Sequence, residues 1–175
     1  MPRLQSASPV RESFPSTVQA ALGFLQAQGS SAWLVGGWLR DALLGRPNSD
    51  VDLAVLGDPL PLAKALAHRF DGTCVLMHEG PVIVRVVLRE DGQAWHLDLA
   101  ALQGSLEQDL ARRDFTVDAL ALPLERLLDG WSVREVVDPV SGLEDLEQRR
   151  IQAASGGVFQ EDPIRLLREI GRAHV

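Results

Sequence analysis

The sequence predicts an α+β fold in which a mixed, partly antiparallel sheet is flanked by helices. Helical and extended segments are mixed along the 175 residues but do not alternate as a regular strand–helix–strand series, which favours α+β over a doubly wound α/β arrangement. Three strand-like runs follow one another between residues 73 and 99, and Asp91-Gly92 separates the last two as a hairpin turn. A chain of this length, 46% apolar, can bury one full core with a small appendage.

The chain is expected to begin with a leader followed by a helix. Residues 1–14 show little periodicity and contain two prolines, so we expect a loose N-terminal leader. A helix then begins near Ser16 or Thr17, either of which can cap it, and runs to about Gln28, where Gly29 ends it. Its predicted apolar face consists of Val18, Leu22 and Leu25.

The remaining elements follow from apolar periodicity and from the glycines and prolines that interrupt it. We expect strands at residues 32–35, 51–55, 73–77, 82–88, 94–99 and 133–137, and helices at residues 38–44 and 61–70. Beyond residue 99 the pattern is mainly helical, apart from the strand at 133–137.

Two acidic residues stand at the start of the 51–55 strand. Asp50 and Asp52 are spaced i, i+2, so both side chains project from the same face of that strand. Two like charges side by side on an apolar strand lower stability unless a cation neutralises them, and hard carboxylate oxygens favour Mg²⁺ or Mn²⁺. A lone D-x-D motif more often marks an acidic strand start that faces water. The neighbouring motifs favour the other interpretation, in which Asp50 and Asp52 are catalytic metal ligands.

A glycine turn precedes these acids. Gly36 and Gly37 lie between the strand at 32–35 and the helix at 38–44, where they let backbone N–H groups approach a phosphate closely. Arg40 and Asp41 follow on that helix, where an ordinary surface ion pair would contribute under about 1 kcal/mol. Beside a phosphate-binding turn, we expect Arg40 to contact a triphosphate and Asp41 to orient Arg40. An anion site next to a metal site is what a nucleoside triphosphate with its Mg²⁺ requires.

Four motifs occur in a fixed order. They are GG-x-x-RD-x-x-x-G at residues 36–45, D-x-D at 50–52, RRDFTVDALAL at 112–122 and EDPIRLLR at 161–168. From about residue 33 to 168 the chain resembles the bacterial-type tRNA nucleotidyltransferase and poly(A) polymerase family. The resemblance implies a polymerase-β-like nucleotidyltransferase head at residues 15–138, followed by a hinge and the truncated start of a helical neck at 139–175. It also implies transfer of CMP or AMP from CTP or ATP to an RNA 3′ end, such as that of tRNA, with release of pyrophosphate.

The resemblance assigns roles to two further pairs. It implies that Arg113 and Asp114 contact the ribose and triphosphate. The E-D-x-x-R element carries over to Asp162 and Arg165, which would act as a protein template for CTP and ATP. An acid can accept from the exocyclic amino group of cytosine or adenine while an arginine donates to ring acceptors. A helix start would explain Glu161, Asp162 and Pro163 without any such role, but not Arg165.

Asp98 is the candidate for a third catalytic carboxylate, which binds a catalytic metal or activates the attacking hydroxyl in many phosphoryl-transfer sites. It falls in the 94–99 strand between Leu97 and Leu99, which face the opposite side. An exposed acid at a strand end explains Asp98 equally well. Asp118 receives no role. The four histidines show no metal-ligand spacing and are left out of the chemistry.

The charge of the chain limits its part in RNA binding. A net charge of −7 with a single lysine, Lys64, is unfavourable for contacting a phosphate backbone, so we expect most RNA contacts in regions outside this chain. No apolar run is long enough to span a membrane and no signal peptide is recognisable, so we expect a cytoplasmic location. Two alternatives stay open: a nucleotidyltransferase with a small-molecule acceptor, and a non-catalytic fragment that binds nucleotide or RNA.

Overall fold

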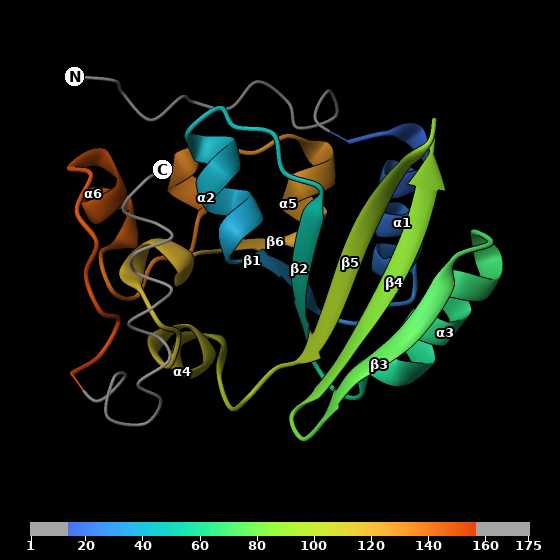
Figure 1. The fold of residues 1–175 in the computed structure, drawn as a ribbon. Coiled ribbons are helices and arrows are strands. Elements are labelled where there is room, and N and C mark those ends of the chain that lie inside the picture. The colour runs from blue at the N-terminus through green and yellow to red at the C-terminus, as the bar shows by residue number, and fades with distance from the viewer. Residues whose placement is uncertain (1–13, 157–175) are drawn as a thin grey trace.

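A computed structural model describes residues 14–156 of the chain as a six-stranded mixed sheet with helices (Figure 1). The strand order is β3-β4-β5-β2-β1-β6. Strand β2 runs parallel to β5, and the other neighbouring strands are antiparallel. The predicted α+β class with a mixed, partly antiparallel sheet is thereby confirmed.

The predicted elements before residue 101 agree with the observed bounds to within two residues. The strands are β1 (Ala32–Val35), β2 (Asp50–Val55), β3 (Thr73–Glu79), β4 (Val82–Glu90), β5 (Gln93–Ala101) and β6 (Ala121–Pro123). The α-helices are α1 (Ser16–Ala27), α2 (Gly37–Leu43), α3 (Pro59–Arg69), α4 (Leu106–Ala111), α5 (Leu124–Asp129) and α6 (Gly142–Glu147). Two 3-10 helices, η2 (Thr116–Asp118) and η3 (Val133–Glu135), follow α4 and α5.

The N-terminus of α1 is not capped by Ser16 or Thr17, contrary to the prediction. Pro15 occupies the N-cap position, and its side chain makes no capping hydrogen bond. Instead, the backbone N–H groups of Ser16 and Thr17 donate to the carboxylate of Glu90, at the end of β4, over 3.2 and 2.7 Å. The end of a strand therefore supplies the acceptors that the first turn of the helix needs, and α1 is tied to the sheet.

The predicted strand at residues 133–137 is wrong. The segment forms η3 because Ser132 and Glu135 make a capping box, in which the Ser132 N–H donates to Glu135 over 2.8 Å. Val137 reaches the sheet through an isolated bridge to Ala121. Strand β6 was missed because three residues ending in a proline give almost no periodic signal.

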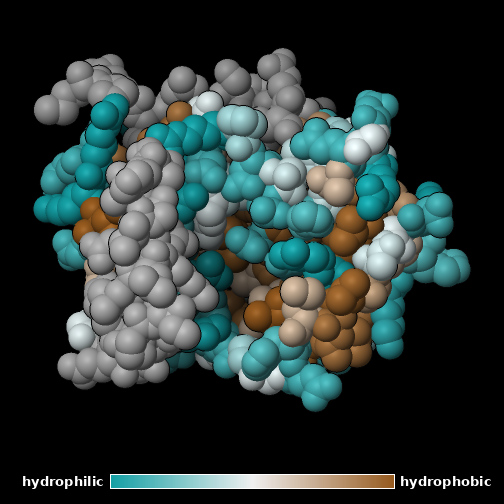
Figure 2. Space-filling model, viewed as in Figure 1, coloured by the Kyte–Doolittle hydropathy of each residue, from teal (hydrophilic) through white to brown (hydrophobic). Residues whose placement is uncertain are grey.

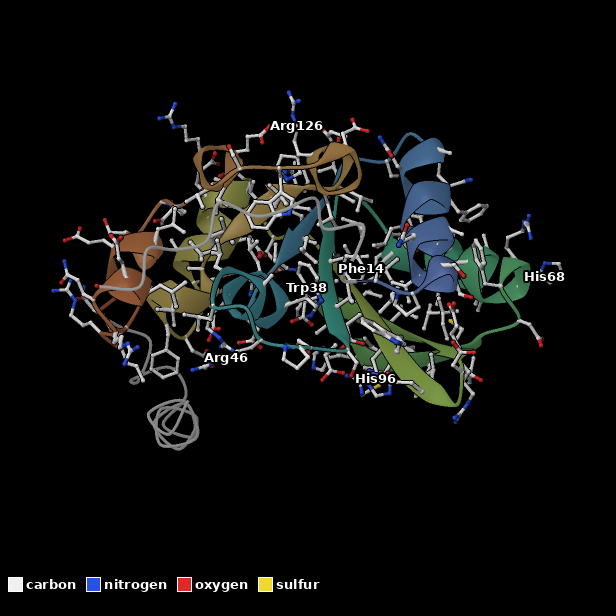
Figure 3. All side chains as sticks on the ribbon, turned by 90° about the horizontal axis from the view of Figure 1, so that it is seen from above. Phe14, Trp38, Arg46, His68, His96 and Arg126 are labelled. Atoms are coloured by element: carbon white, nitrogen blue, oxygen red, sulfur yellow. The ribbon has the colours of Figure 1, made fainter. Side chains whose placement is uncertain are left out.

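The main hydrophobic core lies on one face of the sheet. Helices α1 and α3 pack behind β3, β4 and β5 in Figure 1, and the apolar face predicted for α1 is buried there. Core side chains from β4, β5 and α1 are Val84, Val86, Leu88, Trp95, Leu97, Leu99, Val18, Leu22 and Leu25. Because side chains alternate along a strand, Arg85, His96 and Asp98 point to the opposite face. Figure 3 shows His96 on the side of the sheet away from α1.

The edge strand β3 exposes apolar side chains. Val75, Leu76 and Met77 are 42%, 45% and 52% exposed. Figure 2 shows the corresponding hydrophobic patch on the part of the molecule where β3 and β4 lie. Among the described residues, no helix is long and apolar enough to cross a membrane.

The segment after β6 packs back onto η2. A side chain on Gly142 would collide with the backbone carbonyl of Thr116, so α6 approaches η2 closely. The buried carboxylate of Asp145 accepts a 2.6 Å hydrogen bond from the Thr116 hydroxyl and also contacts Arg150. Phe115 forms an isolated bridge with Ala153. The position of a boundary between head and neck stays a prediction.

Phe14 anchors the helix that carries the glycine turn. Its ring is 5% exposed and stacks on Trp38, the second residue of α2, with 4.5 Å between ring centroids. Trp95 on β5 packs against the same ring edge-on at 5.9 Å. Figure 3 labels Phe14 and Trp38, which lie side by side. Phe14 thus joins α2 to the sheet.

We predict that Phe14→Ala lowers the free energy of unfolding by about 3 kcal/mol, because it removes a buried ring that packs against two others. Urea denaturation of the wild type and the variant measures this change. Phe14→Leu is the control, since it keeps most of the apolar volume and should lose only about 1 kcal/mol. An alanine variant as stable as the wild type would show that Phe14 does not anchor α2.

Candidate active site

Three carboxylates lie on two adjacent strands. Asp50 and Asp52 are the first and third residues of β2, and Asp98 lies on β5 directly opposite Asp52 in the parallel register. Side chains at these positions share the face of the sheet that α1 and α3 leave uncovered. The structure therefore brings together the three acids that the sequence singled out, although Asp98 is separated from them by more than 40 residues of chain.

Asp52 sits at the centre of this negative charge. Partial burial is the largest cause that raises its pKa, to about 6, and the charge of Asp98 is the next. The guanidinium of Arg113 acts in the opposite direction and lowers the pKa. Asp50 and Asp118 contribute smaller increases. A carboxylate in this position is poorly neutralised by the protein alone.

Asp98 is held from its other side by Arg85, a residue that the sequence analysis did not single out. The Nε and Nη2 atoms of Arg85 donate to the two carboxylate oxygens of Asp98, each over 2.7 Å. The two residues are direct partners in the β4–β5 hairpin. The Asp91-Gly92 turn was predicted, and counting outward from it pairs residue 85 with residue 98. This contact could therefore have been found from the sequence.

Asp50 is contacted by His96. The Nδ1 atom of His96 lies 2.7 Å from Asp50 Oδ1, and the two residues are opposite each other in the β2–β5 register. The Asp50 side chain is 60% exposed, so it is the acid most open to solvent among the three. The sequence analysis left His96 out of the chemistry because metal-ligand spacing was the only signal considered.

Gly36 makes room for the side chains of both Arg113 and Asp52. Its φ angle is +72°, and a Cβ placed on it would lie 3.1 Å from Arg113 Nη1 and 3.2 Å from Asp52 Oδ2. Any side chain at this position would therefore push the cation or the acid away. The Gly36 N–H donates to the Leu120 carbonyl over 3.3 Å. The expected contact between this turn and a phosphate stays a prediction.

Arg113 reaches the acids from the end of α4. Its side chain is 24% exposed, and its Nη2 lies 3.4 Å from Asp109. The buried Nε atom has no hydrogen-bond partner within residues 14–156. The neighbouring Asp114 is partly buried, and its backbone carbonyl accepts from the Ala154 N–H over 3.2 Å. Within the described residues, Arg113 therefore holds a buried Nε donor without an acceptor, which is unfavourable.

Arg40 is oriented by two carboxylates. Its Nε donates to Asp41 over 2.9 Å, and its Nη1 donates to Asp118 over 2.6 Å. Asn48 also donates to Asp41, over 2.7 Å. Nη2 lies 3.5 Å from the position that a Cβ on Gly37 would occupy, so the guanidinium lies against the glycine turn. Asp118 received no role in the sequence analysis, and its contact with Arg40 depends on the position of η2.

The remaining candidates cannot be placed. Asp162 and Arg165 lie outside the described residues. Within residues 14–156, no three His, Cys, Asp or Glu side chains converge as a preformed metal-binding cluster. In agreement with that, Asp98 is turned toward Arg85.

Comparisons with known proteins were made for both the sequence and the fold. The sequence matches the model of the poly A polymerase head domain over residues 32–152. A CC-adding tRNA nucleotidyltransferase of Geobacter sulfurreducens is 41% identical over 141 residues, which are 80% of this chain and 31% of the relative. A CCA-adding enzyme of Geobacillus stearothermophilus is 33% identical over 165 residues, which are 87% of this chain and 39% of the relative.

The fold comparison gives the same family. The solved structure of a Thermotoga maritima CCA-adding enzyme complexed with tRNA has a TM-score of 0.76 at 27% identity, over 98% of this chain and 41% of that one. A CCA-adding enzyme in complex with CTP gives a TM-score of 0.75 at 27% identity, over 98% and 42%. This chain thus spans between three and four tenths of the length of the curated relatives described. The resemblance seen in the sequence motifs is confirmed, and the chain belongs to the poly(A) polymerase head domain family.

Proposed function

We propose that this chain is the catalytic head of a metal-dependent, template-independent nucleotidyltransferase that adds CMP or AMP to the 3′ end of tRNA. The observation that carries the proposal is the row of Asp50, Asp52 and Asp98 on two adjacent strands, with the pKa of Asp52 raised to about 6. Relatives named CC-adding and CCA-adding enzymes support tRNA as the acceptor. An RNA 3′-oxygen attacks the α-phosphorus, and the bond to pyrophosphate breaks.

The residues present fit a divalent cation. Asp50 and Asp52 would hold it, because both are carboxylates, and a cation would offset the charges of the acids around Asp52. Oxygen ligands favour Mg²⁺, with Mn²⁺ as a substitute. When bound, the cation stabilises negative charge on the phosphoryl oxygens.

The protein side chains bind and orient the reactants. Arg113 offers the buried Nε that has no acceptor within residues 14–156, and a triphosphate or ribose oxygen would provide one. Arg40, fixed by Asp41 and Asp118, presents Nη2 along the glycine turn to the same phosphates. Asp98 is the acceptor for the proton of the attacking 3′-hydroxyl. Asp114 accepts from the ribose.

Base selection falls to Asp162 and Arg165, as the resemblance implies. Two relatives at 41% and 37% identity are named CC-adding tRNA nucleotidyltransferases, and six others, named CCA-adding enzymes, are 31–35% identical. We therefore propose that CTP is the first substrate. The incorporation assay described next would show addition of AMP if the alternative holds. The net charge of −7 supports tRNA contacts that lie mainly outside this chain.

We predict that Asp52→Asn lowers the rate of CMP addition by about 10³-fold or more, because it removes a metal ligand without changing side-chain size. The measurement is incorporation of labelled CTP or ATP into tRNA that lacks its terminal CCA, with products resolved at single-nucleotide length. Asp91→Asn is the matched control, since Asp91 lies in the exposed β4–β5 turn, where its φ of +52° suits asparagine. An active Asp52→Asn protein would contradict the proposal.

We also predict that Asp52→Asn stabilises the metal-free chain at neutral pH. The pKa of Asp52 is raised from 3.8 to about 6, so the folded state favours the protonated acid. Below pH 4 both states are protonated and the variant gains nothing. Above pH 6 the wild type carries the full penalty of about 3 kcal/mol, so its stability falls as the pH rises between these values.

Urea denaturation at pH 4 and pH 7.5 in EDTA measures this difference. Added Mg²⁺ should reduce the advantage of the variant at pH 7.5, because the cation stabilises only the wild type. A variant less stable than the wild type at pH 7.5 in EDTA would show that Asp52 is not electrostatically strained.

A further inference from the structure

Arg85 and Asp98 form a geometrically defined pair on the open face of the sheet. They are opposite each other on β4 and β5, and both carboxylate oxygens of Asp98 accept from the guanidinium over 2.7 Å. The side chains are 31% and 19% exposed. A two-pronged contact of this kind fixes the plane of the carboxylate as well as its position.

The pair lies in line with the centre of the site. Across the three strands, Asp52 is opposite Asp98 and Asp98 is opposite Arg85. Arg85 therefore pulls Asp98 from the side that faces away from Asp52. Without it, the Asp98 carboxylate would be free to rotate about its side-chain bonds under repulsion from Asp52 and Asp50.

The contact contributes little to stability. A partly exposed ion pair adds little to stability, and the flanking core residues of β4 and β5 already hold the hairpin. Its main consequence is orientational. Each Asp98 oxygen has a second lone pair, so the carboxylate can still accept from a substrate hydroxyl while Arg85 holds it.

We propose that Arg85 is a positioning residue for nucleotidyl transfer, which fixes the Asp98 carboxylate in the orientation that receives the proton of the attacking hydroxyl. The inference rests on the proposed function. Arg85 acts through Asp98 and does not itself contact the nucleotide. Its loss therefore lowers kcat and leaves the KM for CTP unchanged.

The test compares five proteins with the wild type: Arg85→Ala, Arg85→Lys, Asp98→Asn, the Arg85→Ala/Asp98→Asn double variant, and the control Arg89→Ala. Arg89 is an exposed arginine on the same face of β4, opposite Ala94, so the control removes the same charge without touching Asp98. CMP addition to tRNA lacking its CCA gives kcat and KM, and thermal unfolding checks the fold.

We expect Arg85→Ala to lower kcat by about 10- to 100-fold with KM for CTP changed less than about twofold. Arg85→Lys keeps the charge without the planar fork, so its loss should be intermediate. Arg89→Ala should stay within about twofold of the wild type. The double variant should be no slower than Asp98→Asn, because Arg85 has no function once its partner is gone.

Three results would overturn the inference while leaving the proposed function intact. They are an Arg85→Ala protein with wild-type kcat, a rise in KM at constant kcat, and a double variant whose losses multiply, which would mean that Arg85 acts on substrate directly. A wild-type chain that neither adds CMP nor binds Mn²⁺ in a calorimetric titration would overturn the proposed function, and this inference with it.

Discussion

Repulsion among three carboxylates on neighbouring strands determines how the other charged side chains on this face of the sheet are arranged. Asp52 is the acid on which this repulsion acts most directly, since the charges of both Asp98 and Asp50 raise its pKa. Each acid has a partner side chain: Arg113 lies near Asp52, Arg85 contacts Asp98 and the His96 ring contacts Asp50. Arg113 does not offset all the causes that raise the pKa of Asp52, and the proposed divalent ion would supply further positive charge.

The opposite face of the same strands provides the stability that this arrangement needs. Alternate residues of β4 and β5 enter an apolar core, so every strand that presents a charge to the site is anchored by its neighbours on the other side. Glu90 ties α1 to the end of β4, and Phe14 ties α2 to the same layer. Electrostatic strain on one face is thus tolerated because the packing on the other face is dense.

The sequence alone predicts the parts of this site that are local. The spacing of Asp50 and Asp52 on a strand and the Asp91-Gly92 hairpin both depend on contacts between residues close in the chain. The parallel pairing of Asp52 with Asp98, the approach of Asp118 to Arg40 and the capping by Glu90 depend on how distant segments pack, and no local pattern encodes them. The strand predicted at 133–137 failed for a local reason, because a capping box between Ser132 and Glu135 overrode its apolar pattern.

The two-residue turn between β4 and β5 is exposed, but its length determines how the two strands are paired. Asp91 and Gly92 lie at the tip of a hairpin, six residues along each strand from the Arg85–Asp98 contact, yet the length of the turn sets which residues face each other. Many substitutions that keep the backbone shape would be harmless there. A single inserted or deleted residue would move Arg85 out of register with Asp98 and turn one strand over relative to the other. Evolution or engineering could therefore replace Asp91 by another residue that accepts a positive φ, but could not change the length of the turn.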